Sequence, residues 1–105
     1  MISETDVDKA LERLTKPSKM APALGEKLKS EHMLKVTKAL EMKKHEGSVA
    51  SQEREAYSSV EYRMAIQNVV NATIEYEKAR AEVEADKTVI DMWRTQQANQ
   101  RYNIT

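Results

Sequence analysis

Apolar residues recur at helical spacing in three stretches of this chain, and the longest stretch lies in its C-terminal half. There, eleven positions alternate by three and four residues without interruption: Tyr62, Ala65, Val69, Ala72, Tyr76, Ala79, Val83, Asp86, Ile90, Trp93 and Gln97. We call these positions the seam, because such alternation keeps one face of a helix toward a neighbouring helix. The pattern predicts a long helix over residues 60–100. Its larger side chains are expected to form the core or a subunit contact: Tyr62, Val69, Tyr76, Val83, Ile90 and Trp93.

A shorter amphipathic stretch near the N-terminus predicts a helix over residues 4–15. Its apolar residues follow the i, i+3, i+4, i+7 spacing, and Ser3 with an acidic first turn provides the N-terminal signal. Pro17 and Pro22 each disfavour helix in the residue before them. We therefore expect a linker over residues 16–22.

The middle of the chain predicts a basic second helix over residues 23–46. Leucine, methionine and valine side chains cover one broad arc of this segment, and Gly47 is expected to end it. Several serines follow, so residues 47–59 are expected to form a turn, with room for one helical turn over residues 51–57.

These elements predict an all-α fold, in which a long antiparallel helical hairpin carries a short N-terminal helix. A chain of 105 residues forms one small domain, and two glycines and two prolines are too few for the turns of a β-sandwich or barrel. The apolar set contains no phenylalanine and supplies little stability by itself. We therefore expect a homo-oligomer that buries the surplus seam between subunits. An elongated monomer with frayed ends is the alternative.

Composition also excludes some kinds of site and indicates the cellular compartment. The absence of cysteine excludes disulfide scaffolds and thiolate metal sites. The apolar runs are far too short for a membrane span, and the first residues lack the apolar stretch of a secretory signal. We expect a cytoplasmic protein with no membrane partner.

Few residues offer catalytic chemistry. His32 and His45 are thirteen residues apart, so on one helix they are separated by ~20 Å and cannot share a metal. The chain has no glycine-rich phosphate loop and no nucleophile elbow. We therefore expect no enzyme activity, catalytic residue, metal, cofactor or small-molecule substrate. Asp86 is the single acidic seam residue, and it either fixes the register of the helices or faces water at a gap.

Charge is segregated along the chain although it sums to zero. Residues 16–45 carry eight lysines against three glutamates, and residues 46–92 carry ten carboxylates against five basic side chains. Attraction between oppositely charged antiparallel helices explains this pattern in one way. A stripe of cations that contacts phosphates explains it in another. The candidate nucleic-acid-binding residues are Lys16, Lys19, Lys27, Lys29, Arg94, Arg101 and Tyr102.

The C-terminal region combines arginines, aromatic rings and amides, a set that suits single-stranded nucleic acid. Because Trp93 lies on the seam, a hydrophobic anchor is the competing interpretation of its ring. In an antiparallel hairpin, the start of the basic helix would lie near this C-terminal region. We therefore expect the lysines at that end to gather with Arg94 and Arg101.

Two segments carry a resemblance to known proteins. They are Ser51-Gln52-Glu53-Arg54-Glu55-Ala56-Tyr57, followed by Tyr62, and Ile90-Asp91-Met92-Trp93-Arg94-Thr95-Gln96-Gln97-Ala98-Asn99-Gln100-Arg101. This combination resembles small bacteriophage helical proteins of recombination gene clusters. More distantly, the order of a lysine-rich helix, a break and another long helix resembles the UvsY-type recombination mediators. The resemblance spans residues 25–101 and implies a small oligomeric protein of the host-cell cytoplasm that binds single-stranded DNA.

Two functions are therefore expected from sequence. The first is a phage-type recombination or replication accessory factor that binds single-stranded DNA and a recombinase or annealing protein. The second is a non-enzymatic protein-interaction module, such as a virion or scaffold component or an inhibitor of a host protein. Nucleic-acid affinity at physiological salt distinguishes the two.

Overall fold

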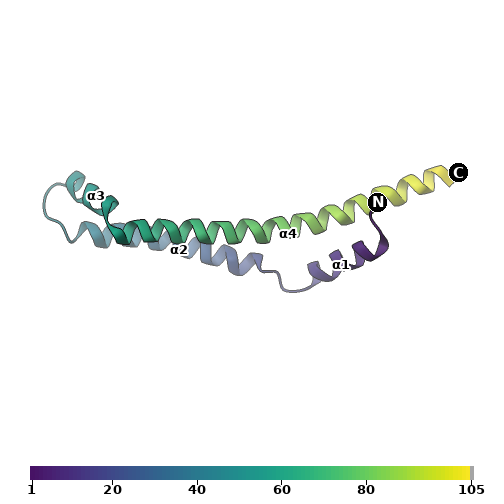
Figure 1. Ribbon diagram of the computed structural model, residues 1–105, viewed down its shortest axis with the longest axis horizontal. Helices are drawn as coiled ribbons and strands as arrows, with labels where there is room; N and C mark the ends of the chain where they lie inside the picture. Colours follow the sequence, from purple (N-terminus) through teal and green to yellow (C-terminus); the bar gives the residue numbers. More distant parts are fainter. Residues whose placement is uncertain (105) are drawn as a thin grey trace. The chain divides into compact units, whose positions relative to one another are not determined.

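The computed structural model describes residues 1–104, and the regular structure of this part is helical. In chain order the helices are α1 (Glu4–Thr15), α2 (Met20–Met42), α3 (Val49–Ser58) and α4 (Val60–Ile104) (Figure 1). The predicted all-α fold, with a long helical hairpin and a short N-terminal helix, is confirmed. The chain divides into two compact units. The hairpin unit is Met20–Glu77, and the terminal unit combines Met1–Lys19 with the chain from Lys78 onward.

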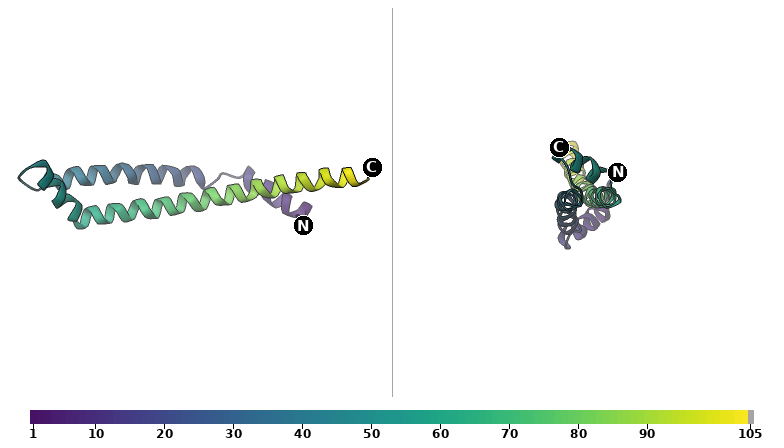
Figure 2. Two further views of the ribbon diagram at one scale, coloured as in Figure 1. Left: turned by 90° about the horizontal axis from the view of Figure 1, so that it is seen from above. Right: turned by 90° about the vertical axis from the view of Figure 1, so that its left-hand side faces the viewer.

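In the hairpin unit, α2 lies antiparallel beside the first part of α4, and α3 lies at the closed end (Figure 2). Helix α2 ends in a tightened turn, in which the N–H groups of Lys44 and His45 donate to the carbonyls of Glu41 and Met42 at 3.1 and 3.2 Å. Gly47 follows with φ +119°, a left-handed conformation that glycine adopts without steric cost. These features let the chain turn back toward α4.

Helix α2 begins and ends earlier than the predicted range 23–46. It starts at Met20 because Pro22 fits the first helical turn, where its missing N–H would have no helical acceptor. The expected linker over 16–22 is correspondingly shorter. The helix ends at Met42 because the tightened turn already breaks its hydrogen-bond ladder.

The stretch 47–59 is not the turn that its serines suggested, because it contains the ten-residue helix α3. Ser48 is the N-cap, and its hydroxyl accepts a hydrogen bond from the N–H of Ser51 at 3.2 Å. Ser59 ends α3, and its hydroxyl accepts from the N–H of Tyr62 at 3.1 Å, at the start of α4. Serine favours such cap positions as well as turns, so the same composition supports either structure.

In the terminal unit, α1 and the later part of α4 are the helical elements. Helix α1 begins with a capping box: the N–H of Asp6 donates to Ser3 Oγ at 3.1 Å, and the N–H of Ser3 donates to Asp6 Oδ2 at 3.0 Å. Val7 and Ala10 are buried on one face of α1, and Ala79 is buried on α4. The face of α1 that its spacing defines is therefore covered in part, since Leu11 on the same face is 46% exposed.

Burial along α4 follows the seam in both units. Ala65, Ala79 and Asp86 are buried, and each of the other seam positions is half-buried. Among the described residues, however, no large side chain is fully buried. The seam therefore faces neighbouring helices, but the apolar burial that a single chain achieves is shallow.

Candidate functional site: the groove of the hairpin unit

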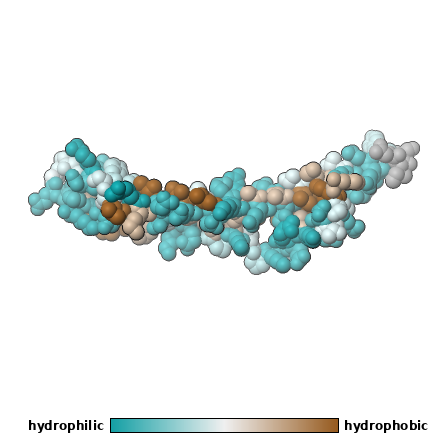
Figure 3. Space-filling model, viewed as in Figure 1, coloured by the Kyte–Doolittle hydropathy of each residue, from teal (hydrophilic) through white to brown (hydrophobic). Residues whose placement is uncertain are grey.

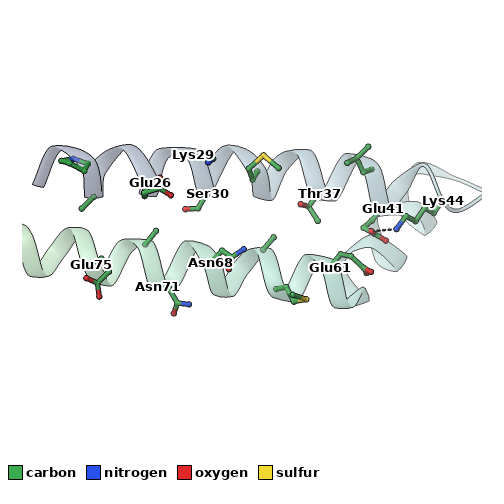
Figure 4. Close-up of a pocket in the computed structure, with 17 residues that line it drawn as sticks. Glu26, Lys29, Ser30, Thr37, Glu41, Lys44, Glu61, Asn68, Asn71 and Glu75 are labelled. Carbon is green, nitrogen blue, oxygen red and sulfur yellow. Dashed lines mark hydrogen bonds and ion pairs between the residues drawn. The ribbon is translucent and has the colours of Figure 1, made fainter. Parts of the chain in front are cut away.

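The hairpin unit has a groove of about 1020 Å³ between α2 and the first part of α4 (Figure 4). Its lining recurs every three or four residues on each helix, so each helix contributes one face. The apolar lining residues are Pro22, Ala23, Met33, Leu40, Met64, Ala65 and Ala72. Small alanines beside the seam leave space that larger side chains would fill, which keeps the groove open.

Charged side chains lie at the two ends of the groove. Glu26, Lys29 and Glu75 lie toward one end, and Glu41, Lys44 and Glu61 lie at the other (Figure 4). Between them the polar lining is uncharged, from Ser30, Thr37, Asn68 and Asn71. An apolar and neutral middle with charged ends resembles the core and rim of a protein interface.

Glu41 is the buried acid of this groove. It is only 5% exposed, and its Oε1 lies 2.7 Å from Lys44 Nζ. This hydrogen bond raises the pKa of Lys44, and the charge of Glu61 adds a smaller effect in the same direction. A buried carboxylate needs such a partner, since an unpaired one would lose its hydration without compensation.

A second set of apolar side chains lies outside the groove. Leu24 and Leu28 of α2 and Ile66, Val70 and Ile74 of α4 are exposed, and none of them lines the groove. Apolar patches are visible along the molecule in the face shown in Figure 3. The hairpin unit therefore exposes more apolar surface than its groove accounts for.

Lysine side chains pack on the rings of seam and α3 tyrosines. Lys27 Nζ lies 5.2 Å from the centre of the Tyr76 ring, and Lys38 Nζ lies 4.9 Å from the centre of the Tyr57 ring. Lys38 also pairs with Glu53 at 3.6 Å, and its hydrogen bond to Tyr57 is the main cause of its raised pKa. These lysines serve the packing of the hairpin.

Tyr57 also links α3 to α4. Its ring makes an edge contact with the seam residue Tyr62 at a centroid distance of 5.1 Å. Neither this contact nor the lysine packing was expected from sequence, since both join segments of different helices.

The predicted nucleic-acid-binding residues divide between the two units, so neither unit holds the whole set. Several also have nearby acids: Lys16 pairs with Glu12 at 3.0 Å, and Arg94 lies 3.9 Å from Asp91. Tyr102 is 87% exposed. The terminal unit holds Lys16, Lys19, Arg94, Arg101 and Tyr102, and the hairpin unit holds Lys27 and Lys29.

Sequence reasoning missed two lysines of α2 and of the turn that follows it. Lys35 and Lys43 are exposed, as is Lys29, and in the described part of the chain none of the three forms an ion pair. The signal was present in the number of lysines in residues 16–45. The prediction instead favoured lysines near the C-terminal arginines.

In the terminal unit, Asp86 is buried and paired with Arg13. Arg13 Nη2 donates to Asp86 Oδ1 at 2.7 Å, and Nε donates to Oδ1 and Oδ2 at 3.0 and 3.1 Å. These hydrogen bonds lower the pKa of Asp86 and raise that of Arg13. The sequence left two interpretations of Asp86 open. The one in which Asp86 faces water at a gap is wrong, because Asp86 joins α4 to α1. Arg13 itself gave no signal in the sequence.

The remaining seam residues of the terminal unit include Val83, Ile90 and Trp93, and all three are half-buried. Within residues 1–104, no helix combines the length and apolar character needed to cross a bilayer. In the same range no group of three or more histidines, cysteines or carboxylates is placed to hold a metal ion. Comparisons with protein families, curated proteins and solved structures give no match for this chain.

Proposed function

We propose that the protein is a non-enzymatic interaction module that self-assembles through its hairpin unit. The observation that carries the proposal is an inversion of burial within this unit. Lys27 and Lys38 are half-buried against aromatic rings, whereas Leu40 is 54% exposed and Met64 is 62% exposed. Isolated apolar residues on a surface are ordinary, but a contiguous set along a groove marks an interaction site.

Energetics support the same proposal. Small helical domains gain only a few kcal/mol from one core, and the core of this chain is shallow. Removing an exposed leucine or methionine side chain from water contributes about 1.5–3 kcal/mol of stabilising free energy. A neighbouring helical surface on the groove would therefore supply stability that one chain lacks.

The test is light scattering or sedimentation of the full chain over a range of concentrations. We expect an oligomer, and we expect the double variant Leu40→Lys, Met64→Lys to weaken association by at least ~100-fold, because each copy then buries two fewer apolar side chains. Met92→Lys is the matched control, since Met92 is 51% exposed but lies in the terminal unit. A monomeric chain at about 100 µM, or an oligomer that the double variant leaves intact, contradicts the proposal.

The second candidate is a phage-type recombination or replication accessory factor that binds single-stranded DNA and a recombinase or annealing protein. The exposed, unpaired lysines Lys29, Lys35 and Lys43 favour it, because cations without protein partners are available to phosphates. The resemblance to UvsY-type mediators supports the same function. Self-assembly is compatible with it, since a mediator can bind DNA as an oligomer.

Fluorescence anisotropy with single-stranded and double-stranded oligonucleotides across a salt series tests this candidate. Reversing the charges of Lys29, Lys35 and Lys43 is expected to reduce the slope of log affinity against log salt by about 0.7 for each phosphate that the variant no longer neutralises. Reversing Arg94 and Arg101 tests the terminal unit separately. A well-folded chain without affinity at physiological salt removes this candidate.

A further inference from the structure

The charged groove residues of α2 and of the turn that follows it are opposite in sign at equal distances on either side of residue 35. Glu26 and Lys44 each lie nine residues from position 35, and Lys29 and Glu41 each lie six residues from it. In two antiparallel helices, residues at one height have numbers that add to a constant, because every residue advances the helix equally. A two-fold axis at the level of residue 35 would therefore set Glu26 against Lys44 of a second copy. The same axis sets Lys29 against Glu41 of that copy.

Uncharged groove residues fill the space between these pairs. The same axis sets Ser30 against Leu40 of the second copy, and Met33 against its Thr37. Helix periodicity by itself places groove positions symmetrically about a midpoint, but it does not decide the sign of their charges. Both charged pairs are attractive, and this self-complementarity is what an isologous interface requires.

We propose that a second copy of this chain occupies the groove, with its α2 antiparallel to the first α2, so that two hairpins form a four-helix dimer. This proposal rests on the proposed self-assembly, and it names the occupant and the register. The dimer brings together the groove faces, so apolar side chains from both hairpins cover one another.

The available area fits a stable dimer. Helix α2 has 23 residues and is therefore ~35 Å long at its ordinary rise. Two helices side by side present a face about 20 Å wide. With the axis at residue 35, the groove faces of the two copies overlap over residues 26–44, which is ~28 Å of helix. The overlap of each face measures roughly 570 Å², and the two faces bury roughly 1,100 Å², above the ~1,000 Å² that a biological interface needs.

The dimer also gives the buried carboxylate of Glu41 a second cation. Within one chain its ion-pair partner is Lys44 at 2.7 Å. A carboxylate has acceptor sites beyond those that one ammonium group fills. Lys29 of the second copy lies at the matching height and reaches the same groove wall.

A rival arrangement places α2 against α4 of the second copy. It would bring Lys29 toward Glu75 and Lys44 toward Glu61, which are also opposite charges at the groove ends. The two arrangements predict different neighbours for the same α2 residue. Covalent crosslinking therefore separates them.

The crosslinking experiment uses the full chain, which has no native cysteine. Ser30→Cys and Leu40→Cys chains are mixed, equilibrated and mildly oxidised, and light scattering records the oligomer before oxidation. We expect a disulfide-linked dimer in the mixture. Each variant alone should crosslink poorly, because its two copies of the cysteine lie ten residues or ~15 Å apart along the helix. A disulfide spans at most ~7 Å between Cα atoms.

The outcomes separate this proposal from the one on which it rests. A dimer in which position 30 crosslinks to Glu75→Cys rather than to position 40 overturns the α2 pairing but leaves self-assembly intact. A dimer with neither crosslink does the same. A monomer overturns both proposals. A disulfide between positions 30 and 40 supports the antiparallel pairing directly.

A charge-reversal variant provides a second readout. Glu26→Lys is expected to weaken the dimer by about tenfold, since it faces Lys44 of the other copy. Lys35→Glu is the control, since Lys35 lies on α2 but does not line the groove. Lys44 itself is left unchanged, because it is the partner of the buried Glu41. A Glu26→Lys variant that associates as tightly as the Lys35→Glu variant overturns the pairing.

Discussion

The terminal unit and the hairpin unit differ in how their helices are held together and in the surface that they leave exposed. The terminal unit covers Val7 and Ala10 and pairs its one buried acid, Asp86, with Arg13 from another helix. The hairpin unit packs lysines against tyrosine rings and leaves Leu40 and Met64 exposed. The buried acid of the hairpin unit, Glu41, is also paired, with Lys44, but this unit in addition has an uncovered apolar groove.

This difference shows how one helix can serve two purposes. Helix α4 carries the same alternation of three and four residues through both units, and its seam positions are buried or half-buried in each. The two units differ because a different helix packs beside α4 in each of them. Helix α1 supplies a matching charge and small apolar residues, whereas α2 presents apolar groups that the chain does not cover.

The largest effect on local stability is expected from Arg13→Ala. This variant tests whether the terminal unit is stabilised independently of the hairpin unit. The substitution leaves Asp86 buried without its partner, so α1 should detach and its amides should exchange roughly tenfold faster or more. Exchange in the hairpin unit should stay unchanged. Hydrogen-exchange mass spectrometry measures both, and Arg94→Ala serves as control because its ion pair is exposed. Faster exchange in α2 or α3 would show that the units are not independent.

A matched pair of buried alanines sharpens the comparison. Ala10 in α1 and Ala56 in α3 are both fully buried. Ala10→Leu and Ala56→Leu should each cost about 1–3 kcal/mol through overpacking. Urea unfolding gives the total loss, and hydrogen exchange locates it. We expect Ala10→Leu to open α1 and Ala56→Leu to open α3; the opposite pattern would contradict the division into units.

A smaller loss of stability is expected from removing a helix N-cap, and the loss should differ between the caps of α1 and α3. Ser3 belongs to a reciprocal capping box, whereas Ser48 accepts one hydrogen bond and has Ser51 in place of the reciprocating acid. Ser3→Ala should therefore cost about 1 kcal/mol, and Ser48→Ala should cost less. Circular dichroism during thermal unfolding compares the variants. Equal losses would show that Asp6 adds nothing to the cap of α1.

The smallest effect is expected from mild acid. Arg13 lowers the pKa of Asp86, so the ion pair contributes fully above the aspartate pKa of the unfolded chain, about 4, and is lost as the pH falls further. Exchange protection of α1, corrected for intrinsic rates, should not change between pH 7 and pH 5. It should fall below pH about 4. Loss of protection already at pH 5 would mean that another group holds α1.

The sequence was sufficient to predict the helices whose burial follows a long, regular pattern. The alternation from Tyr62 to Gln97 predicts which face of α4 is covered, because helical geometry alone relates those positions. The sequence allowed one helical turn over residues 51–57 but could not predict the full helix α3, because serine suits both a turn and a helix cap. The function of Ser48 and Ser59 depends on the conformation of the backbone on either side of them.

The groove and the ion pair were beyond sequence reasoning for a different reason. Arg13 and Asp86 are 73 residues apart, and only the packing of α1 on α4 joins them. The expected gathering of α2 lysines with Arg94 and Arg101 assumed a particular register between two helices of different length. Within the hairpin unit Lys27 packs on Tyr76, and a hydropathy pattern contains no information on such a register.

The seam also restricts which insertions and deletions α4 can accept. Its positions repeat every seven residues, which corresponds to about 10.5 Å of helix. Inserting or deleting seven residues in α4 would therefore leave every face pointing as before, apart from a turn of roughly 20°. A deletion of five would rotate the remaining helix by about 140° and turn its seam toward solvent. Variants of such a hairpin are thus free to change length in heptad steps, and other steps carry a heavy cost in misplaced side chains.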